Sequence, residues 1–229
     1  MVMVQAAAFG PQKGAKSQLM VALITAAQLT LPVLFFAGIA VLIVWRSDHA
    51  IHEIDRFFRL RSADTLPSTW LTQAHLLLPL LSFAVILCNR RYGLGHATLQ
   101  ILFGIGLGIA AVVGIERVEP QILPDFTWPA WRLSASFFGA LVLSLLLGAV
   151  VFDMTRGVRW WQAPFYSGIA FALIAAGVFY PAAHAGLHEH WLDQMVLHGL
   201  AMMIAAILFL IPYYLIRPLI VPMPGFGGR

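Results

Sequence analysis

The stretch LSASFFGALVLSLLLGAVVF, residues 133–152, decides the fold of this chain, because it is apolar and contains no charged side chain. A helix of about 20 residues crosses a hydrocarbon core of about 30 Å and satisfies its own backbone hydrogen bonds. Five further runs of this kind occur in the chain. The six runs are about Leu19–Trp45, Thr69–Cys88, Ala97–Ile115, Leu133–Phe152, Ala163–Ala182 and Met195–Ile216, and every charged residue lies outside them. The sequence therefore predicts an all-α, polytopic membrane protein with a six-helix transmembrane bundle.

The composition supports this fold class and excludes two others. Hydrophobic residues make up 60% of the 229 residues and charged residues only 10%, while the mean hydropathy is +0.84. These values exclude a soluble globular domain and a disordered chain. We expect one transmembrane domain over residues 19–216, with cytoplasmic tails at 1–18 and 217–229.

The placement of charge predicts the topology. If the N-terminus is cytoplasmic, the inner segments hold eight basic residues against the single acid Asp153, a net charge of +7. The outer segments then hold six Arg against nine acids, a net charge of −3. This split follows the positive-inside rule and places both termini in the cytoplasm. The pI of 9.6 is thereby explained by topology, and we expect no nucleic-acid partner.

The first outer connection has an amphipathic pattern over residues 47–60. Apolar residues near one helical face alternate with charged residues on the others, and Asp55 and Arg59 form a favourable i,i+4 pair. We expect a short helix lying on the outer membrane interface. It would serve as a lid over the bundle mouth, as a docking surface, or simply as a connector resting on headgroups.

Neutral polar side chains inside the runs are the candidate ligand contacts. The runs contain no Asp, Glu, Lys or Arg, which counts against a carrier driven by an intramembrane carboxylate. The candidate substrate-binding residues are Gln73, His75, Gln100, Ser144 and His198. Each can hydrogen-bond a small uncharged ligand, and each can equally bind a neighbouring helix.

Histidines gather on the predicted outer side and suggest a second kind of site. His184, His188 and His190 lie close together in sequence, and the spacing of the first two suits metal chelation if the stretch is helical. A zinc, copper or haem site is the functional interpretation, with solvated loop histidines as the alternative. The chain has no phosphate-binding glycine loop, serine nucleophile elbow or HExxH motif, so we expect no enzymatic activity and no other cofactor.

Three inner segments carry a resemblance to a known family. They are LPLLSF at 78–83 followed by NRRYG at 89–93, VFD at 151–153 followed by RWWQAP at 159–164, and IPYY at 211–214. In order and spacing they resemble the queuosine-precursor transporter family over about residues 70–216. The resemblance implies a six-helix carrier in a bacterial inner membrane that imports 7-deazaguanine bases.

The sequence departs from that family pattern where the family carries charged residues within the spans. An ungapped comparison places Ile86, Gly148, Ala175, His198 and Met202 at those positions. A purine-like base with unpaired polar groups in an apolar pocket would lose a few kcal/mol. The departures therefore predict an altered substrate on a shared scaffold.

Three function classes follow from these observations. The first is a small-molecule carrier with a more apolar or neutral substrate. The second is a transport-inactive structural subunit, with another membrane protein or a second copy of this chain as partner. The third is a metal- or haem-binding membrane protein that uses the outer histidines. The lipid bilayer is the common partner of all three.

Overall fold

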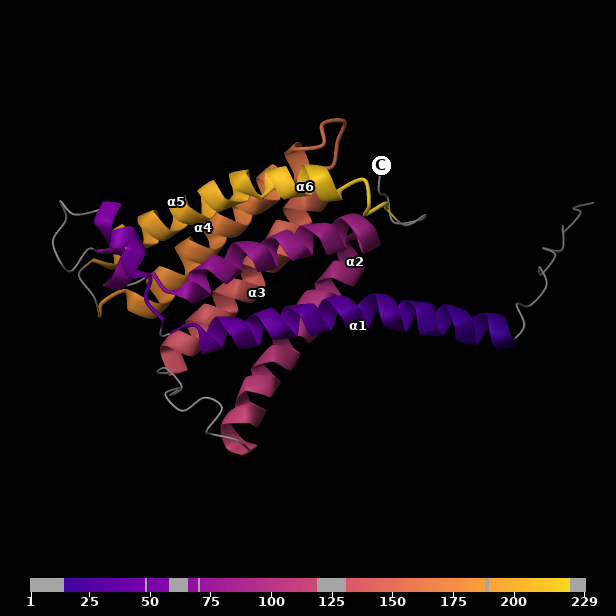
Figure 1. Cartoon of the computed structure of the whole chain (residues 1–229), viewed down its shortest axis with the longest axis horizontal. Coiled ribbons are helices and arrows are strands. Elements are labelled where there is room, and N and C mark those ends of the chain that lie inside the picture. Colours follow the sequence, from indigo (N-terminus) through magenta and orange to yellow (C-terminus); the bar gives the residue numbers. More distant parts are fainter. Residues whose placement is uncertain are drawn as a thin grey trace, which may run out of the picture.

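The computed structural model describes residues 15–47, 49–57, 66–69, 71–118, 131–187 and 190–222. Six α-helices and two short 3-10 helices form this part of the chain. Helix α1 runs along the long axis of the molecule, and the second part of α2 crosses it obliquely (Figure 1). One end of the bundle holds η1 and the start of α2. The other end holds the middle of α2 and the short helix α6.

Helix α2 (Gln73–Val118) is 46 residues long and changes direction at Gly93. With a rise of 1.5 Å per residue, a straight helix of this length would span about 69 Å, roughly twice a hydrocarbon core. Gly93 has φ 79° and ψ 171°, a backbone region open only to glycine, and here the helix breaks into arms 73–92 and 94–118. Figure 1 shows the chain running to the far end of the bundle and returning. The connection between the predicted runs Thr69–Cys88 and Ala97–Ile115 is thus helical except at Gly93.

Helix α1 (Ala15–Trp45) packs on the second arm of α2 through two glycines. A Cβ built on Gly104 would lie 2.5 Å from the Cβ of Phe36, and one on Gly108 would lie 2.6 Å from the Cβ of Ala40. The two backbones therefore approach closely only because glycine stands at both positions. In lipid the hydrophobic effect does not drive helices together, so close van der Waals packing of this kind stabilises their association.

The remaining helices complete the bundle. They are α3 (Trp131–Met154), α4 (Gln162–His184), α5 (Trp191–Leu208) and α6 (Leu210–Ile216). Gly148 of α3 lies against the Ser167 carbonyl of α4, and Gly168 of α4 lies against Ala206 of α5. The helix changes course at Phe209 between α5 and α6, three residues before Pro212, whose nitrogen carries no hydrogen.

The predicted amphipathic segment 47–60 contains the 3-10 helix η1 (His52–Phe57), whereas its residues 47 and 49–51 are not helical. Residues 48 and 58–60 lie outside the described residues. Helix η1 is tied to η3 (Pro67–Thr69), since the backbone N–H of Ser68 donates to Oδ1 of Asp55 at 2.9 Å. The hydrogen bonds from Ser68 hold the pKa of the Asp55 carboxyl below its ordinary value. Ala50 and Thr72 form an isolated antiparallel bridge beside them.

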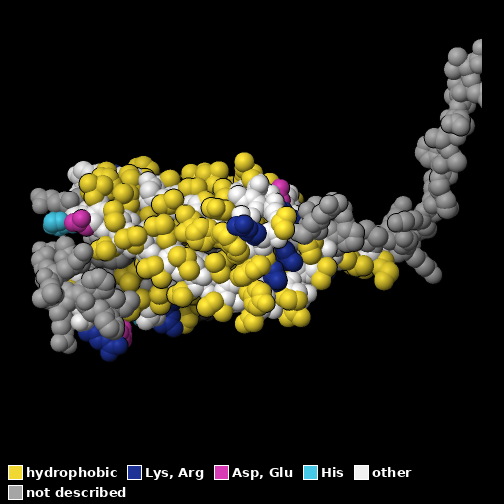
Figure 2. All heavy atoms as spheres, turned by 90° about the horizontal axis from the view of Figure 1, so that it is seen from above, with side chains coloured by type: hydrophobic (Ala, Val, Ile, Leu, Met, Phe, Trp, Pro, Cys, Tyr) yellow, Lys and Arg dark blue, Asp and Glu magenta, His cyan; other side chains and the backbone are white. Residues whose placement is uncertain are grey.

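Five helical segments in the described residues are long and apolar enough to cross a membrane. They are Ala26–Trp45, Gln73–Val118, Trp131–Met154, Gln162–His184 and Trp191–Ile216. Two of the six predicted runs lie in the single element α2. On the face seen in Figure 2, a broad hydrophobic band separates charged side chains gathered toward the two ends. This arrangement fits an integral membrane protein.

Candidate functional site

A hollow opens between α2, α3, α4 and α5 near the end of the bundle that holds η1. Its cavity volume is about 20 Å³, which is room for about one water molecule, and the hollow is partly open to the surroundings. Its lining residues are His75, Leu78, Phe137, Ala140, Leu141, Phe171, Ala175, Phe179 and His198. Two imidazole rings therefore supply the polar atoms of an otherwise apolar wall. We call this space the outer hollow.

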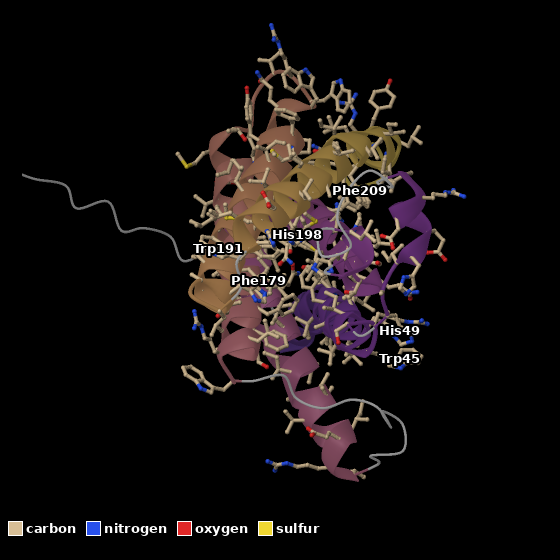
Figure 3. The ribbon with its side chains drawn as sticks, turned by 90° about the vertical axis from the view of Figure 1, so that its left-hand side faces the viewer. Trp45, His49, Phe179, Trp191, His198 and Phe209 are labelled. Atoms are coloured by element: carbon tan, nitrogen blue, oxygen red, sulfur yellow. The ribbon has the colours of Figure 1, made fainter. Side chains whose placement is uncertain are left out.

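His75 and His198 meet at the outer hollow from different helices. Their ring centroids lie 4.7 Å apart with the planes at 79°, an edge-to-face contact. His198 is buried and projects from α5 near the middle of the bundle, as seen down its axis in Figure 3. The contact joins the first turn of α2 to the middle of α5, so it depends on the tertiary fold.

The orientation of His75 is fixed by the start of α2. Thr72 precedes the first helical residue, and its backbone N–H donates to Nδ1 of His75 at 3.1 Å. This is the geometry of a capping box, in which the third helical residue accepts from the N-cap backbone. A backbone N–H can only donate, so Nδ1 of His75 carries no hydrogen and the neutral ring holds its proton on Nε2.

Aromatic rings continue from this pair along α4. The Tyr180 ring lies 5.6 Å from the His198 ring and 5.7 Å from the His184 ring, measured between centroids. Phe179 contacts His184 at 5.6 Å. The buried Tyr180 therefore separates His184, at the end of α4, from the histidine pair at the hollow.

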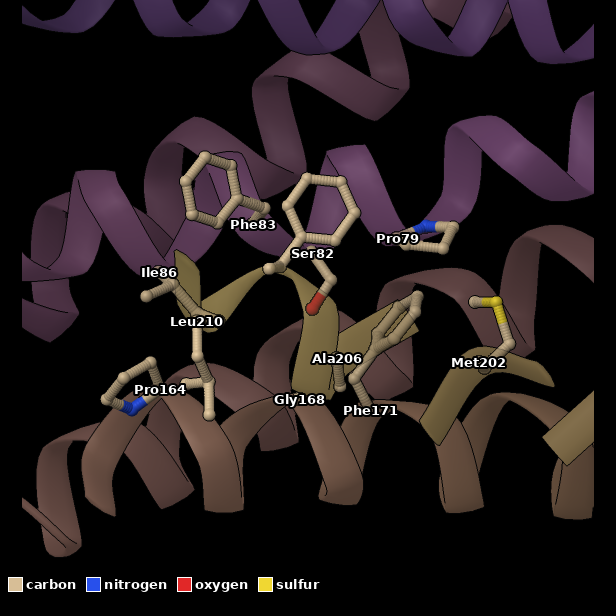
Figure 4. Close-up of a pocket in the computed structure, with 11 residues that line it drawn as sticks. Pro79, Ser82, Phe83, Ile86, Pro164, Gly168, Phe171, Met202, Ala206 and Leu210 are labelled. Carbon is tan, nitrogen blue, oxygen red and sulfur yellow. The ribbon is translucent and has the colours of Figure 1, made fainter. Parts of the chain in front are cut away.

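A second hollow lies further along α2, α4 and α5 (Figure 4). Its cavity volume is also about 20 Å³, it is again partly open, and its lining is apolar except for Ser82. The lining residues are Pro79, Ser82, Phe83, Ile86, Pro164, Gly168, Phe171, Met202, Ala206, Phe209 and Leu210. We call this space the inner hollow. Phe171 lines both hollows, so its buried ring lies where one ends and the other begins.

The other predicted substrate-binding residues have protein partners. Gln73 accepts a hydrogen bond from Arg46 at 3.1 Å, and Gln100 donates to the Gln28 carbonyl of α1 at 3.1 Å. Ser144 donates to the carbonyl of Leu141 in its own helix at 2.9 Å. These three side chains line neither hollow, whereas His75 and His198 line the outer one.

Two of the three predicted metal ligands, His184 and His190, lie at the same end of the bundle as the outer hollow. His184 ends α4, and Nδ1 of His190, before α5, is 3.8 Å from a carboxylate oxygen of Asp193. His188 falls outside the described residues. Among the residues that the structure places, no group of three His, Cys, Asp or Glu side chains is arranged to hold a metal ion. The metal or haem site stays a prediction.

A polar cluster at the opposite end was not predicted from the sequence. Asn89 is fully buried and donates to the carbonyl of Ala149 at 2.7 Å. Arg156 donates to the carbonyl and side-chain oxygens of Asn89, at 2.7 and 3.0 Å, and pairs with Asp153 at 3.0 Å. The signal in the sequence is polar residues just after two apolar runs. Asn89 follows the run Thr69–Cys88, and Asp153 and Arg156 follow the run Leu133–Phe152.

Comparison with known proteins gives no assignment. No protein-family model, no curated protein and no solved structure matches this chain. The functional argument therefore rests on the geometry of the two hollows.

Proposed function

We propose that this protein is a membrane carrier for a small, uncharged and largely apolar molecule. The observation that supports it is the stacking of the two hollows. Both are lined by the first arm of α2, by α4 and by α5, and Phe171 is common to them. A ligand larger than water would require the lining side chains to move apart in each hollow, and Phe171 to move for passage between them.

The topology of the carrier follows from the break in α2. If arms 73–92 and 94–118 each cross the bilayer, the chain makes six crossings and both termini lie on one side. The charge split of +7 and −3 derived from the sequence supports the cytoplasmic side. The cluster of Asn89 and Arg156 would then close the bundle at its inner end. The placement in a bacterial inner membrane belongs to this proposal.

The walls of the hollows indicate the chemical class of the substrate. Outside the two imidazoles and Ser82, the lining side chains are apolar, so a charged solute would lose its hydration without compensation. The proposed substrate is therefore neutral, with one or two polar groups for the histidines. The scaffold of the queuosine-precursor transporters, with an altered substrate, stays part of this proposal.

Uptake into liposomes tests the proposal. Purified protein is reconstituted, incubated with a mixture of neutral solutes of differing polarity, and the trapped solutes are identified by mass spectrometry. We expect at least one solute to enter faster than in empty liposomes. Ala175→Phe, which fills the outer hollow, should abolish this uptake, whereas Leu173→Phe on the exposed face of the same helix should not.

Either of two results would overturn the proposal of a carrier. Either no solute enters faster than in protein-free liposomes, or Ala175→Phe transports as well as the unaltered protein. In both cases the outer hollow is no part of a transport path.

One observation favours the structural-subunit alternative. The apolar segment Trp191–Ile216 is only 17% buried, the least of the five. Its exposed large side chains follow a helical spacing and form one ridge: Leu192, Val196, Leu200, Ile204, Ile207, Leu208 and Ile211. A partner helix could cover this ridge as well as lipid does. Stable co-purification of another membrane protein or a second copy in mild detergent would support this alternative, and a monomer without a partner would exclude it.

A further inference from the structure

Arginines gather at the end of the bundle that holds α6. The end of the first arm of α2, the connection between α3 and α4, and α6 with the residues after it supply them. Residues 89–93, 153–162 and 210–222 contain five arginines and one acid: Arg90, Arg91, Arg156, Arg159, Arg217 and Asp153. Figure 2 shows basic side chains at the right-hand end of the hydrophobic band. This end therefore carries an excess of positive charge next to the apolar surface.

Three of the five arginines have polar partners within the protein. Nε of Arg90 donates to the carbonyl of Ile220 at 3.1 Å, and Arg91 donates to the carbonyl of Val221. Arg156 belongs to the polar cluster described above, in which it also neutralises the single acid of this end. These contacts hold the chain after α6 against α2, and they leave two arginines to account for.

Arg217 is held by aromatic rings. Its Cζ lies 5.2 Å from the centroid of the Trp160 ring and 5.0 Å from that of Tyr214, and the two rings are 5.0 Å apart. Within the described residues, its guanidinium forms no hydrogen bond or ion pair. Contact with the ring faces stabilises the cation without using its N–H groups. Arg217 is thus fixed in place with its donors available to an acceptor from outside the chain.

Arg159 adds a second available guanidinium. Its side chain is exposed, and it directly precedes Trp160, whose ring contacts Arg217. In the part of the chain that the structure describes, Arg159 likewise has no hydrogen-bond or ion-pair partner. Two guanidinium groups with unused donors on either side of one indole ring favour an anion, and phosphate suits their planar geometry.

An apolar surface continues from these arginines along α6. Ile211 lies one turn before Tyr214 and Leu215, and all three side chains are exposed. Trp160 is exposed as well, and exposed Trp and Tyr side chains are typical of the headgroup layer of a membrane. An anion held here would have hydrocarbon-compatible surface directly beside it. A phospholipid matches both parts of this surface, whereas a free phosphate matches only the arginines.

We propose that Arg159 and Arg217 form a binding site for the phosphate of an anionic phospholipid. Both guanidinium groups donate to the phosphate oxygens, Trp160 and Tyr214 keep Arg217 in place, and the acyl chains lie along the exposed side chains of α6. The site lies away from both hollows, and its proposal does not depend on the carrier function.

Lipid retention by the purified protein tests this site. The full chain is immobilised in mild detergent, stripped of lipid and titrated with radiolabelled phosphatidylglycerol or phosphatidylcholine of identical acyl chains. Arg217→Gln and Arg159→Gln each remove one guanidinium. Arg117→Gln is the matched control, because Arg117 is an exposed arginine at the far end of α2. Thermal unfolding without lipid checks that each variant is folded.

We expect the unaltered protein to bind phosphatidylglycerol more tightly than phosphatidylcholine, a comparison that needs no variant. Each of the two site variants should weaken the binding of phosphatidylglycerol by about fivefold, and the control should leave it unchanged. An excess of inorganic phosphate should not displace the lipid, because phosphate makes no contact with the apolar surface.

Four results would overturn the site. They are equal binding of the two lipids, undiminished binding of phosphatidylglycerol in the folded site variants, an equal loss in Arg117→Gln, and displacement of the lipid by inorganic phosphate. The last result would indicate a site for free anions instead.

Discussion

Asn89 shows how one polar side chain organises an apolar bundle. It lies at the end of the first arm of α2, fully buried, and joins the Ala149 carbonyl of α3 to the guanidinium of Arg156. A buried amide is tolerated in such surroundings only when its donor and acceptor both have partners. The end of the bundle opposite η1 is therefore held by specific hydrogen bonds rather than by apolar packing alone.

Replacing Asn89 should consequently destabilise the fold. In Asn89→Ala the Ala149 carbonyl loses its donor and Arg156 loses one acceptor, which should cost about 1–3 kcal/mol. Thermal unfolding in detergent measures the change, with Arg159→Ala at an exposed position as control. Equal melting temperatures for the two variants would show that the cluster contributes nothing.

We predict that the stability of the connection between α1 and α2 depends on pH through Asp55. Its pKa is lowered by the hydrogen bonds from Ser68, so this contact stabilises the connection fully above the ordinary Asp pKa. The stabilisation is lost as the pH falls through the lowered value. The protection factor of the Ser68 amide, its exchange rate relative to the intrinsic rate at the same pH, should therefore fall on acidification, and Asp55→Asn should remove this acid-dependent step. An unchanged pH profile in Asp55→Asn would contradict the assignment.

At the scale of single residues, the sequence contains the candidates but not their partners. His75 and His198 are both predicted to face a ligand, and the structure brings them together at one hollow. Gln100 and Ser144 belong to the same predicted set, yet they bind backbone carbonyls of their own bundle. Polarity within an apolar run marks a residue that needs a partner, and only the tertiary fold decides which partner it finds.

At the scale of elements, glycines determine how closely the helices approach. Gly104 and Gly108 of α2 face α1, whereas the neighbouring Gly106 has no atom within 4 Å of a built Cβ. Two glycines four residues apart, as at 104 and 108, are typical of close helix packing in membranes. This pattern does not predict α1 as the partner, because spacing along one helix carries no information about which helix it meets.

Alanine substitution tests this packing with a control in the same helix. In Gly108→Ala the new Cβ would lie 2.6 Å from the Cβ of Ala40, so α1 must move away and stability should fall. Gly106→Ala meets nothing and should be neutral or slightly stabilising, since alanine is the better helix former. Thermal unfolding compares the two. A larger loss in Gly106→Ala would contradict the close approach of α1 to α2.

Gly93 allows a similar comparison at the break in α2. Its φ of 79° is unfavourable for any residue with a Cβ, so Gly93→Ala should cost about 1–3 kcal/mol. Gly95→Ala lies in the helical arm beyond, where a Cβ meets nothing within 4 Å, and should be tolerated. Chemical unfolding in mixed micelles measures both. If Gly93→Ala were as stable as Gly95→Ala, the sharp break would not be a feature of the native fold.

At the scale of the whole molecule, hydropathy is sufficient for the fold class and insufficient for the site. Runs such as Leu133–Phe152 predict helices that the structure contains, here α3, with ends displaced by two residues. The two hollows arise where side chains of neighbouring helices fail to fill the space between them. Their positions depend on how Phe171 packs against side chains of other helices. The hydrophobic pattern along the sequence does not predict this packing.

The central claim is that the two hollows form one path divided at Phe171, and cysteine accessibility tests it most directly. In a Cys88→Ser background, Ala175→Cys marks the outer hollow, Ala206→Cys the inner hollow and Leu173→Cys the exposed face of α4. Membrane-impermeant thiol reagents are applied to intact cells and to inverted vesicles. We predict that Ala175→Cys reacts from one side only, Ala206→Cys from the opposite side only, and Leu173→Cys from neither. Reaction of both hollow positions from the same side, or of neither from any side, would contradict the account.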